Sequence, residues 1–443
     1  MDRESDFKLF AKYTSFNIMS MIGLSCYILA DTYFIARGLG ENGLAALNIA
    51  IPAYSFINGI GLMLGIGGGT KYAINKALAK EKECDHIFIH MLYAAIFFAF
   101  IFMLLGLTRS DEVSFLLGSS VETLNMTSVY VKITLLFSPA FMINNILNCF
   151  VKNDGEPKLA MVAMLCGSIF NIIFDYIFIF PMNLGMAGAA MATGASPVVG
   201  ILILSIHFFR KNNNFHFCRA KLNFKFYRQC LPLGVPALIT ELSSGLVIVI
   251  FNILILKSAG NIGVAAYGII ANISLVVVAV YTGIAQGIQP VLSDAFGKRL
   301  KSRIKNVVAY GVITSLIISI VVYSLLFIKA DYFAMLFNRD QNMELQKIAI
   351  NGIRMYFAAI PFVGFNIITA SYFASVEQKI PAQLVSVLRG FVILIPFVFI
   401  MSKIWKLNGI WLSFPATELI TSIIAVLCFV SIRNQNNKSL IKR

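Results

Sequence analysis

Long apolar segments separated by short polar loops run along the whole chain. A helix that spans a membrane needs about 20 mostly apolar residues. The pattern predicts twelve such segments, near 13–36, 44–70, 87–107, 124–151, 159–180, 187–209, 231–256, 264–293, 307–328, 345–374, 382–402 and 408–432. We therefore expect an all-α membrane protein with twelve transmembrane helices.

Composition agrees with this pattern and excludes a soluble protein. Of the 443 residues, 58% are hydrophobic and only 13% are charged, whereas soluble domains are about 25% charged. The net charge of +15 is dispersed over short loops rather than gathered on one module, so we expect no nucleic-acid partner. The expected surroundings are a lipid bilayer.

The distribution of Lys and Arg predicts the orientation of the helices. If the N-terminus is cytoplasmic, the inner segments carry 25 of the 36 Lys and Arg residues. Positive residues are enriched in cytoplasmic loops. We therefore expect a multi-pass protein of the bacterial plasma (inner) membrane with both termini in the cytoplasm.

The two halves of the chain resemble each other. The segment GLGENGLAALNIA (38–50) aligns with SAGNIGVAAYGII (258–270), so that Gly40 falls on Gly260 and Gly43 on Gly263. Six helices per half is an even number, so both copies run the same way through the membrane. We expect an N-terminal lobe (1–209), a basic cytoplasmic linker (210–230) and a C-terminal lobe (231–443) around a central cavity. Rocking of two such lobes favours a transporter, although a receptor or structural protein could also arise by duplication.

Four polar residues of the first half share one depth in the predicted membrane. Asp31 and Asp175 each lie five residues before the outer end of a span, roughly 8 Å below it. Asn171 lies one helical turn from Asp175, and Thr193 is at a similar depth in the next span. Such a set could bind Na⁺, or one of two neighbouring carboxylates could hold a proton. The same residues could also serve only to join helices by hydrogen bonds. Tyr130 is a weaker candidate, as a hydrogen-bond partner of this site.

Two further acids lie near the middle of predicted spans in the second half. Glu241 and Glu418 are each about ten residues into a span, roughly 15 Å deep. Ionisable groups at this depth are costly and are usually functional. Glu241 is our candidate for a substrate or proton site. Glu418 is a weaker candidate, and Arg389 is another. Either acid could instead form a structural ion pair with Arg389 or Arg354.

Nothing in the sequence predicts an enzyme. The chain has only four His residues, and no Ser-His-Asp arrangement or His-Cys metal cluster is apparent. The run GLMLGIGGGTK (61–71) lacks the register of a phosphate-binding loop. We expect no catalytic residues, no cofactor and no ATP site.

Three segments resemble the multidrug and toxic compound extrusion (MATE) family of transporters. They are DTYFIARGLGENGLAAL (31–47), FNIIFDYIFIFPMNLGMAGAAMAT (170–193) and LPLGVPALITELSSG (231–245). The resemblance is closest to the bacterial DinF-like and MepA-like branch. It implies two pseudo-symmetric six-helix lobes in a V shape, functional as a monomer.

The resemblance also implies a function. Family members export small cationic amphipathic molecules in exchange for inward H⁺ or Na⁺, which would be the coupling ion. It places Asp31, Asn171, Asp175 and Thr193 in the cation site of the N-terminal lobe, and Glu241 as the acid of the C-terminal lobe. The alternative is a flippase for a lipid-linked oligosaccharide or another amphipathic lipid, which would require a basic cavity.

Two departures from the family pattern affect these expectations. Some members have a proline in the first helix, but residues 15–17 of this chain contain none. Some members also have an Asp in the tenth helix, but residues 345–374 of this chain contain none. The resemblance therefore implies no Na⁺ site in the C-terminal lobe.

Overall fold

The fold is all-helical in a computed structural model that describes residues 5–338 and 342–441. The helices of the first half are α1 (Asp6–Ala77), α2 (Glu81–Thr108), α3 (Ser110–Leu116), α4 (Leu124–Leu136), α5 (Ser138–Asn153), α6 (Pro157–Ile179), α7 (Gly185–Ser205) and the 3₁₀ turn η1 (Ile206–Phe209). Those of the second half are α8 (Phe224–Gly297), α9 (Lys301–Ile328), α10 (Ala330–Phe337), α11 (Met343–Tyr356), the 3₁₀ turn η2 (Phe357–Ala359), α12 (Ile360–Ser375), α13 (Lys379–Val387), the π-helical turn η3 (Leu388–Val392) and α14 (Leu394–Ile441). These described ranges contain no β-strand.

The helices confirm a multi-pass membrane protein. Over the described residues, eight helical stretches are long and apolar enough to cross a membrane, or nine if α4 and α5, which meet at a bend of 49°, form one span. Three of these stretches contain a backbone break, at Gly40 in α1, at Gly260 in α8 and at Lys406 in α14. Divided at these breaks, the nine stretches correspond to the twelve spans predicted from the sequence.

The internal repeat is visible in the backbone itself. Gly40 has φ 68° and ψ −159°, and Gly260 has φ 62° and ψ −160°. This region of dihedral space is essentially open only to glycine. A Cβ on either residue would meet nothing within 4 Å, so backbone conformation rather than packing requires glycine there. Each glycine turns the chain from one span into the next at the same place in its half.

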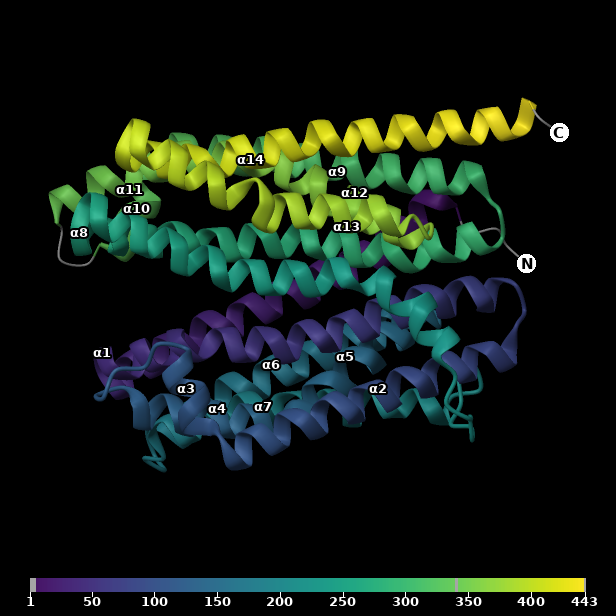
Figure 1. Ribbon diagram of the computed structural model, residues 1–443, viewed down its shortest axis with the longest axis horizontal. Coiled ribbons are helices and arrows are strands. Elements are labelled where there is room, and N and C mark those ends of the chain that lie inside the picture. The colour runs from purple at the N-terminus through teal and green to yellow at the C-terminus, as the bar shows by residue number, and fades with distance from the viewer. Residues whose placement is uncertain (1–4, 339–341, 442–443) are drawn as a thin grey trace.

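Two hydrophobic cores divide most of the helices between them. The first core contains buried residues from Ile35 to Cys230, and the second is built largely from residues between Phe251 and Trp411. Phe10 and Tyr13, at the start of α1, pack in the second core. Figure 1 shows the corresponding two groups of helices side by side, with both ends of the chain at the same end of the molecule.

The two groups of helices touch closely near that end. A Cβ on Gly234 of α8 would lie 1.9 Å from the carbonyl oxygen of Met63 in α1. In a second contact between the same two helices, a Cβ on Gly287 of α8 would lie 2.6 Å from Cα of Thr14 in α1. Glycine therefore permits backbone-to-backbone contact of α1 and α8, as small residues do between membrane helices.

Large apolar side chains cover the outside of the helices. Phe97 and Phe100 on α2 are 61% and 66% exposed, and Ile317 and Ile320 on α9 are 57% and 65% exposed. Soluble monomers do not expose apolar surface on this scale. These residues belong against lipid, as the composition predicted.

Candidate functional site

The structure brings Asp31 and Asp175 together in the interior of the first core. Asp31 lies on α1 and Asp175 on α6; they are 7% and 0% exposed. Their carboxyl groups hydrogen-bond to each other. Two carboxyl groups can do so only when one of them carries a proton. The Oδ1 atoms of both residues are buried with no other partner.

Asn171 and Thr193 complete this polar cluster, as their shared depth in the sequence predicted. The Asn171 amide donates to the Thr193 hydroxyl over 3.4 Å. In the flipped amide orientation it donates instead to Asp175 Oδ2 over 3.0 Å and accepts the Thr193 N–H over 3.3 Å. Tyr130, which is 4% exposed, contacts Thr193 through its hydroxyl. Either amide orientation thus links α6 to α7.

This donor set fits a proton or a hard cation. It offers carboxylate, amide and hydroxyl oxygens but no sulfur or imidazole, a combination that suits alkali and alkaline-earth ions rather than transition metals. No cluster of three or more His, Cys, Asp or Glu residues occurs within residues 5–338 and 342–441. A pair of acids that shares one proton can exchange that proton for Na⁺ with no change in the net charge of the site.

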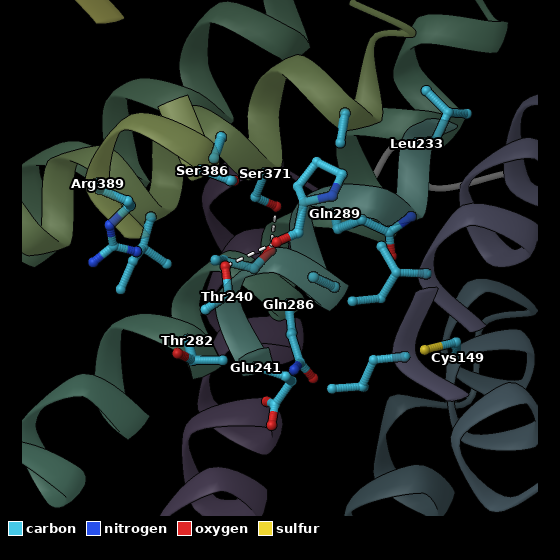
Figure 2. Close-up of a pocket in the computed structure, with 18 of the residues that line it drawn as sticks. Cys149, Leu233, Thr240, Glu241, Thr282, Gln286, Gln289, Ser371, Ser386 and Arg389 are labelled. Atoms are coloured by element: carbon cyan, nitrogen blue, oxygen red, sulfur yellow. Dashed lines mark hydrogen bonds between the residues drawn. The ribbon is translucent and has the colours of Figure 1, made fainter. Parts of the chain in front are cut away.

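Glu241 lies elsewhere, on the wall of a central cavity. This cavity of about 140 Å³ is lined by residues of α1, α5, α8, α12, α13 and η3. Figure 2 shows Glu241 on its wall with Gln286, Thr282 and Arg389. Its lining is largely apolar with a few polar groups, as in most sites for small molecules.

Asn58 connects Glu241 to the first core. It hydrogen-bonds to the Glu241 carboxyl group and accepts from Asn145 Nδ2 through its own Oδ1 over 2.8 Å. Asn58 also lines a second cavity, of about 50 Å³, together with Tyr54 and Thr193. A polar path therefore leads from the central cavity to the edge of the Asp31–Asp175 cluster. Sequence reasoning missed this residue, although an amide in the middle of an apolar span is a signal of the same kind as Asn171.

Glu418 forms a structural ion pair, which was one of the two alternatives left open by the sequence. Arg389 Nη2 donates to Glu418 Oε1 over 2.8 Å, and Asn366 Nδ2 donates to Glu418 Oε2 over 2.7 Å. Glu418 is 1% exposed, so all of its charge is met inside the protein. Arg354 lies apart from it and packs over the Phe327 ring at 5.2 Å.

Another buried acid, Asp154, organises the end of the molecule where the termini lie. Its Oδ1 accepts from Tyr72 over 2.6 Å and from Lys76 over 2.5 Å; its Oδ2 accepts from the Asn214 backbone N–H over 2.9 Å. Burial would raise the pKa of this carboxyl, but the hydrogen bond to His207 and the Lys76 ammonium hold the pKa at about 2. Asp154 thereby ties the linker to the first core.

The fold and the site define a multi-pass helical membrane transporter rather than an enzyme. The MatE family profile matches residues 17–177 and 236–400, and the chain belongs to that family. The multidrug export protein MepA of Staphylococcus aureus is 27% identical over 434 residues, which cover 96% of this chain and 95% of that protein. MepA of Staphylococcus saprophyticus is 26% identical over 95% of this chain and 93% of its own length.

Solved structures confirm the fold. An outward-facing multidrug resistance MATE family transporter superposes with a TM-score of 0.91 at 21% identity, covering 99% of this chain and 98% of that one. A transporter of the wider MOP superfamily from Pyrococcus furiosus, described as having a binding pocket of reverse polarity, superposes with a TM-score of 0.89 at 21% identity over 100% of this chain and 98% of that chain.

Proposed function

We propose that this protein is a multidrug exporter that works by secondary antiport. It exports cationic amphipathic molecules and takes H⁺ or Na⁺ inward in exchange. Support comes from its membership of the MatE family, from relatives named multidrug export proteins and from a central cavity with Glu241 on its wall.

The observation that carries the antiport proposal is the Asp31–Asp175 pair. These acids are buried in the first core and do not line the central cavity. An ion bound between them therefore does not occupy the place of the substrate, and the two sites influence each other through the conformation of the protein. Asn58, which hydrogen-bonds to Glu241, and the small cavity that it lines with Thr193 connect the two sites physically.

The choice between H⁺ and Na⁺ as the coupling ion depends on which of them offsets the negative charge of Asp31 and Asp175. The hydrogen bond between the two carboxyl groups favours a shared proton. A Na⁺ ion would need both carboxylates ionised, with Asn171 and Thr193 adding neutral oxygens. We therefore propose H⁺ as the principal coupling ion, with Na⁺ as the competing one.

We also propose the orientation and the working state. Both termini lie in the cytoplasm of a bacterial cell, and the protein functions as a monomer with two rocking lobes, 1–209 and 231–443, joined by a linker, 210–230. The close contacts at Gly234 and Gly287 lie at the end of the molecule where both termini lie. That end would therefore be closed to the cytoplasm in this conformation.

A flippase for a pyrophosphate-linked lipid fits the cavity less well. Pyrophosphate carries at least two negative charges, and a cavity for it would present several free cations. Of the two cations on the central cavity, Arg389 is neutralised by Glu418, which leaves Lys152, and Glu241 adds a negative charge to the wall.

Export of ethidium tests the proposal. A drug-sensitive bacterial host that expresses the protein should expel preloaded ethidium severalfold faster than the same host without it. The Asp31→Asn variant, expressed to the same level, should lose this gain, because an amide cannot take up and release the proton. If ethidium leaves both hosts at the same rate across a panel of cationic dyes, the exporter proposal is wrong.

A further inference from the structure

The linker between the two halves follows α2 along part of its length. The His216 backbone N–H donates to Asp85 Oδ1 over 2.7 Å, and the Tyr93 hydroxyl donates to the Ala220 carbonyl oxygen over 3.5 Å. Tyr93 lies about two helical turns beyond Asp85, so the linker runs beside this helix for roughly 12 Å. Figure 1 shows the linker at the end of the molecule where the termini lie.

These contacts place the linker at the level of the membrane surface. Tyr93 lies inside the apolar segment predicted at 87–107, so Ala220 is roughly 9 Å beyond the point where that segment begins. The polar headgroups of a bilayer meet the acyl chains near this level. Side chains that the linker exposes there therefore meet lipid as well as water.

The exposed side chains of this stretch are of two kinds, large apolar groups and cations. Phe217, Leu222 and Phe224 are 66%, 63% and 77% exposed. Four exposed cations lie among them or just after them: Arg219, Lys221, Lys225 and Arg228. Residues 210–230 contain no Asp or Glu, and none of the four cations forms an ion pair with a described residue. A lipid with a negative headgroup would satisfy both kinds of side chain at once.

The start of α8 forms an open hollow that continues this surface into the membrane. Lys225 and Arg228 line it near the linker, and Leu231 and Pro232 line it further along the helix. Leu231 lies roughly 9 Å deeper in the membrane than Lys225, at 1.5 Å per residue. Positive charge above apolar surface is the order in which a phospholipid presents its phosphate and its acyl chains.

Orientation of the helices alone does not require this arrangement. Positive residues direct topology from any short cytoplasmic loop. The turn at 298–301, between α8 and α9, also carries Lys and Arg but exposes only one large apolar side chain, Leu300, at 40%. The combination of cations, exposed aromatic rings and a hollow therefore sets the linker and the start of α8 apart from that turn.

We propose that residues 217–232 bind an anionic phospholipid of the surrounding bilayer. Lys225 and Arg228 hold the phosphate, and the acyl chains lie along Leu231. This inference goes beyond drug export and does not depend on it. The proposed orientation makes the leaflet the cytoplasmic one, whose negative surface strengthens the binding of a basic segment about fivefold per Lys or Arg.

Quenching of a tryptophan by brominated lipids tests this inference. Phe224→Trp supplies the reporter, because position 224 is exposed and has room for the larger ring; the emission of Trp405 and Trp411 in the parent protein is subtracted. The protein is placed in phosphatidylcholine vesicles that contain the same mole fraction of brominated phosphatidylglycerol or brominated phosphatidylcholine. We expect phosphatidylglycerol to quench the reporter at least twofold more, because the anionic lipid is concentrated at the site.

Two further variants of the reporter protein locate the preference. The site variant replaces the four cations of the linker and α8: Arg219→Gln, Lys221→Gln, Lys225→Gln and Arg228→Gln. The matched control replaces four exposed cations at the same end of the molecule: Lys298→Gln, Arg299→Gln, Lys301→Gln and Lys305→Gln. The site variant should be quenched equally by the two lipids, whereas the control should keep the preference for phosphatidylglycerol.

Three results would overturn the inference. The first is equal quenching by the two lipids in the Phe224→Trp protein itself, which needs no change of charge. The second is an equal loss of preference in the site and control variants, because the basic end of the molecule would then attract anionic lipid without a site. The third is loss of the preference on addition of millimolar inorganic phosphate, which would assign the four cations to a soluble anion; a lipid site predicts no such effect.

Discussion

The carboxyl groups of Asp31 on α1 and Asp175 on α6 hydrogen-bond to each other inside the first core. Such a hydrogen bond requires a proton on one of the two acids. Each has one oxygen atom, Oδ1, that is buried without any further partner. The pair holds together only while it keeps that proton or replaces it with a cation, and this makes it suited to respond to an ion gradient.

Replacement of one acid should uncouple transport from the gradient. Asp31→Asn keeps the size and one hydrogen-bonding oxygen of the side chain but cannot exchange a proton. We expect the initial rate of gradient-driven efflux to fall at least tenfold, with near-normal expression. Glu122→Gln is the matched control, because Glu122 is exposed in the turn before α4 and lies outside the cluster. Comparable losses in the two variants would contradict the assignment.

Asn58 offers a test of the path between the two sites. Asn58→Leu removes the hydrogen bonds to Glu241 and Asn145 with little change in volume. We expect the apparent KM for ethidium to rise severalfold, because Glu241 loses the amide that hydrogen-bonds to it. Dye binding to purified protein at several pH values measures this directly. If binding and its pH dependence stay at wild-type values, Asn58 plays no part in linking the sites.

The contact of α1 and α8 should tolerate no side chain at Gly234. Gly234→Ala places a Cβ 1.9 Å from the Met63 carbonyl oxygen, so the two backbones must separate. Overpacking of this kind typically costs about 1–3 kcal/mol, and we expect a lower Tm in detergent together with impaired transport. Gly268→Ala, on the same helix, is the control: nothing lies within 4 Å of its Cβ, and alanine is favoured over glycine in a helix by about 1 kcal/mol. Equal Tm values for the two variants would count against the close packing.

The lowered pKa of Asp154 predicts how the stability of the protein depends on pH. Its pKa is lowered from 3.8 to about 2, so its ionised form is favoured by folding. The resulting stabilisation, roughly 2 kcal/mol, is fully present above about pH 4 and is lost as the pH falls towards 2. Asp154→Asn should therefore lower the free energy of unfolding at neutral pH by about that amount, measured by thermal unfolding in detergent. The difference from wild type should shrink below pH 4; a constant difference would contradict this explanation.

The ion pair between Lys71 and Glu377 should help to keep the end of the molecule with the termini closed. Lys71 Nζ lies 2.5 Å from Glu377 Oε1, joining the end of α1 to the turn after α12. Partly exposed pairs contribute about 0–1 kcal/mol, so Lys71→Glu should slow transport by about twofold to fivefold through like-charge repulsion. The double exchange of Lys71→Glu with Glu377→Lys should restore the rate. Failure of the exchange to restore it would show that the charge pair itself is not what matters.

The sequence predicted those features that depend on periodicity and on depth in the membrane. The matching glycines 40 and 260 predicted the repeat, and the structure gives both the same backbone conformation. Asp31 and Asp175 could be placed together because straight helices convert residue counts into depth. Contacts between the two halves could not be predicted this way, because the sequence of one span does not show which face of that helix packs against the other half.

Lys152 and Glu418 illustrate that limit. The sequence predicts no partner for Lys152, because its contact with Gln286 exists only when the two groups of helices pack together. The partner of Glu418 was left open because Arg389 lies in the π-helical turn η3. One extra residue in such a turn rotates the side chains that follow, so regular helical spacing could not show which face carries Arg389.

The most direct test of antiport through the Asp31–Asp175 pair is dye transport in proteoliposomes under separately imposed pH and Na⁺ gradients. With wild-type protein we predict that a pH gradient alone drives uphill ethidium movement, and that the Asp31→Asn variant binds ethidium but moves it only downhill. Uphill transport by Asp31→Asn at the wild-type rate, under either gradient, would contradict the account.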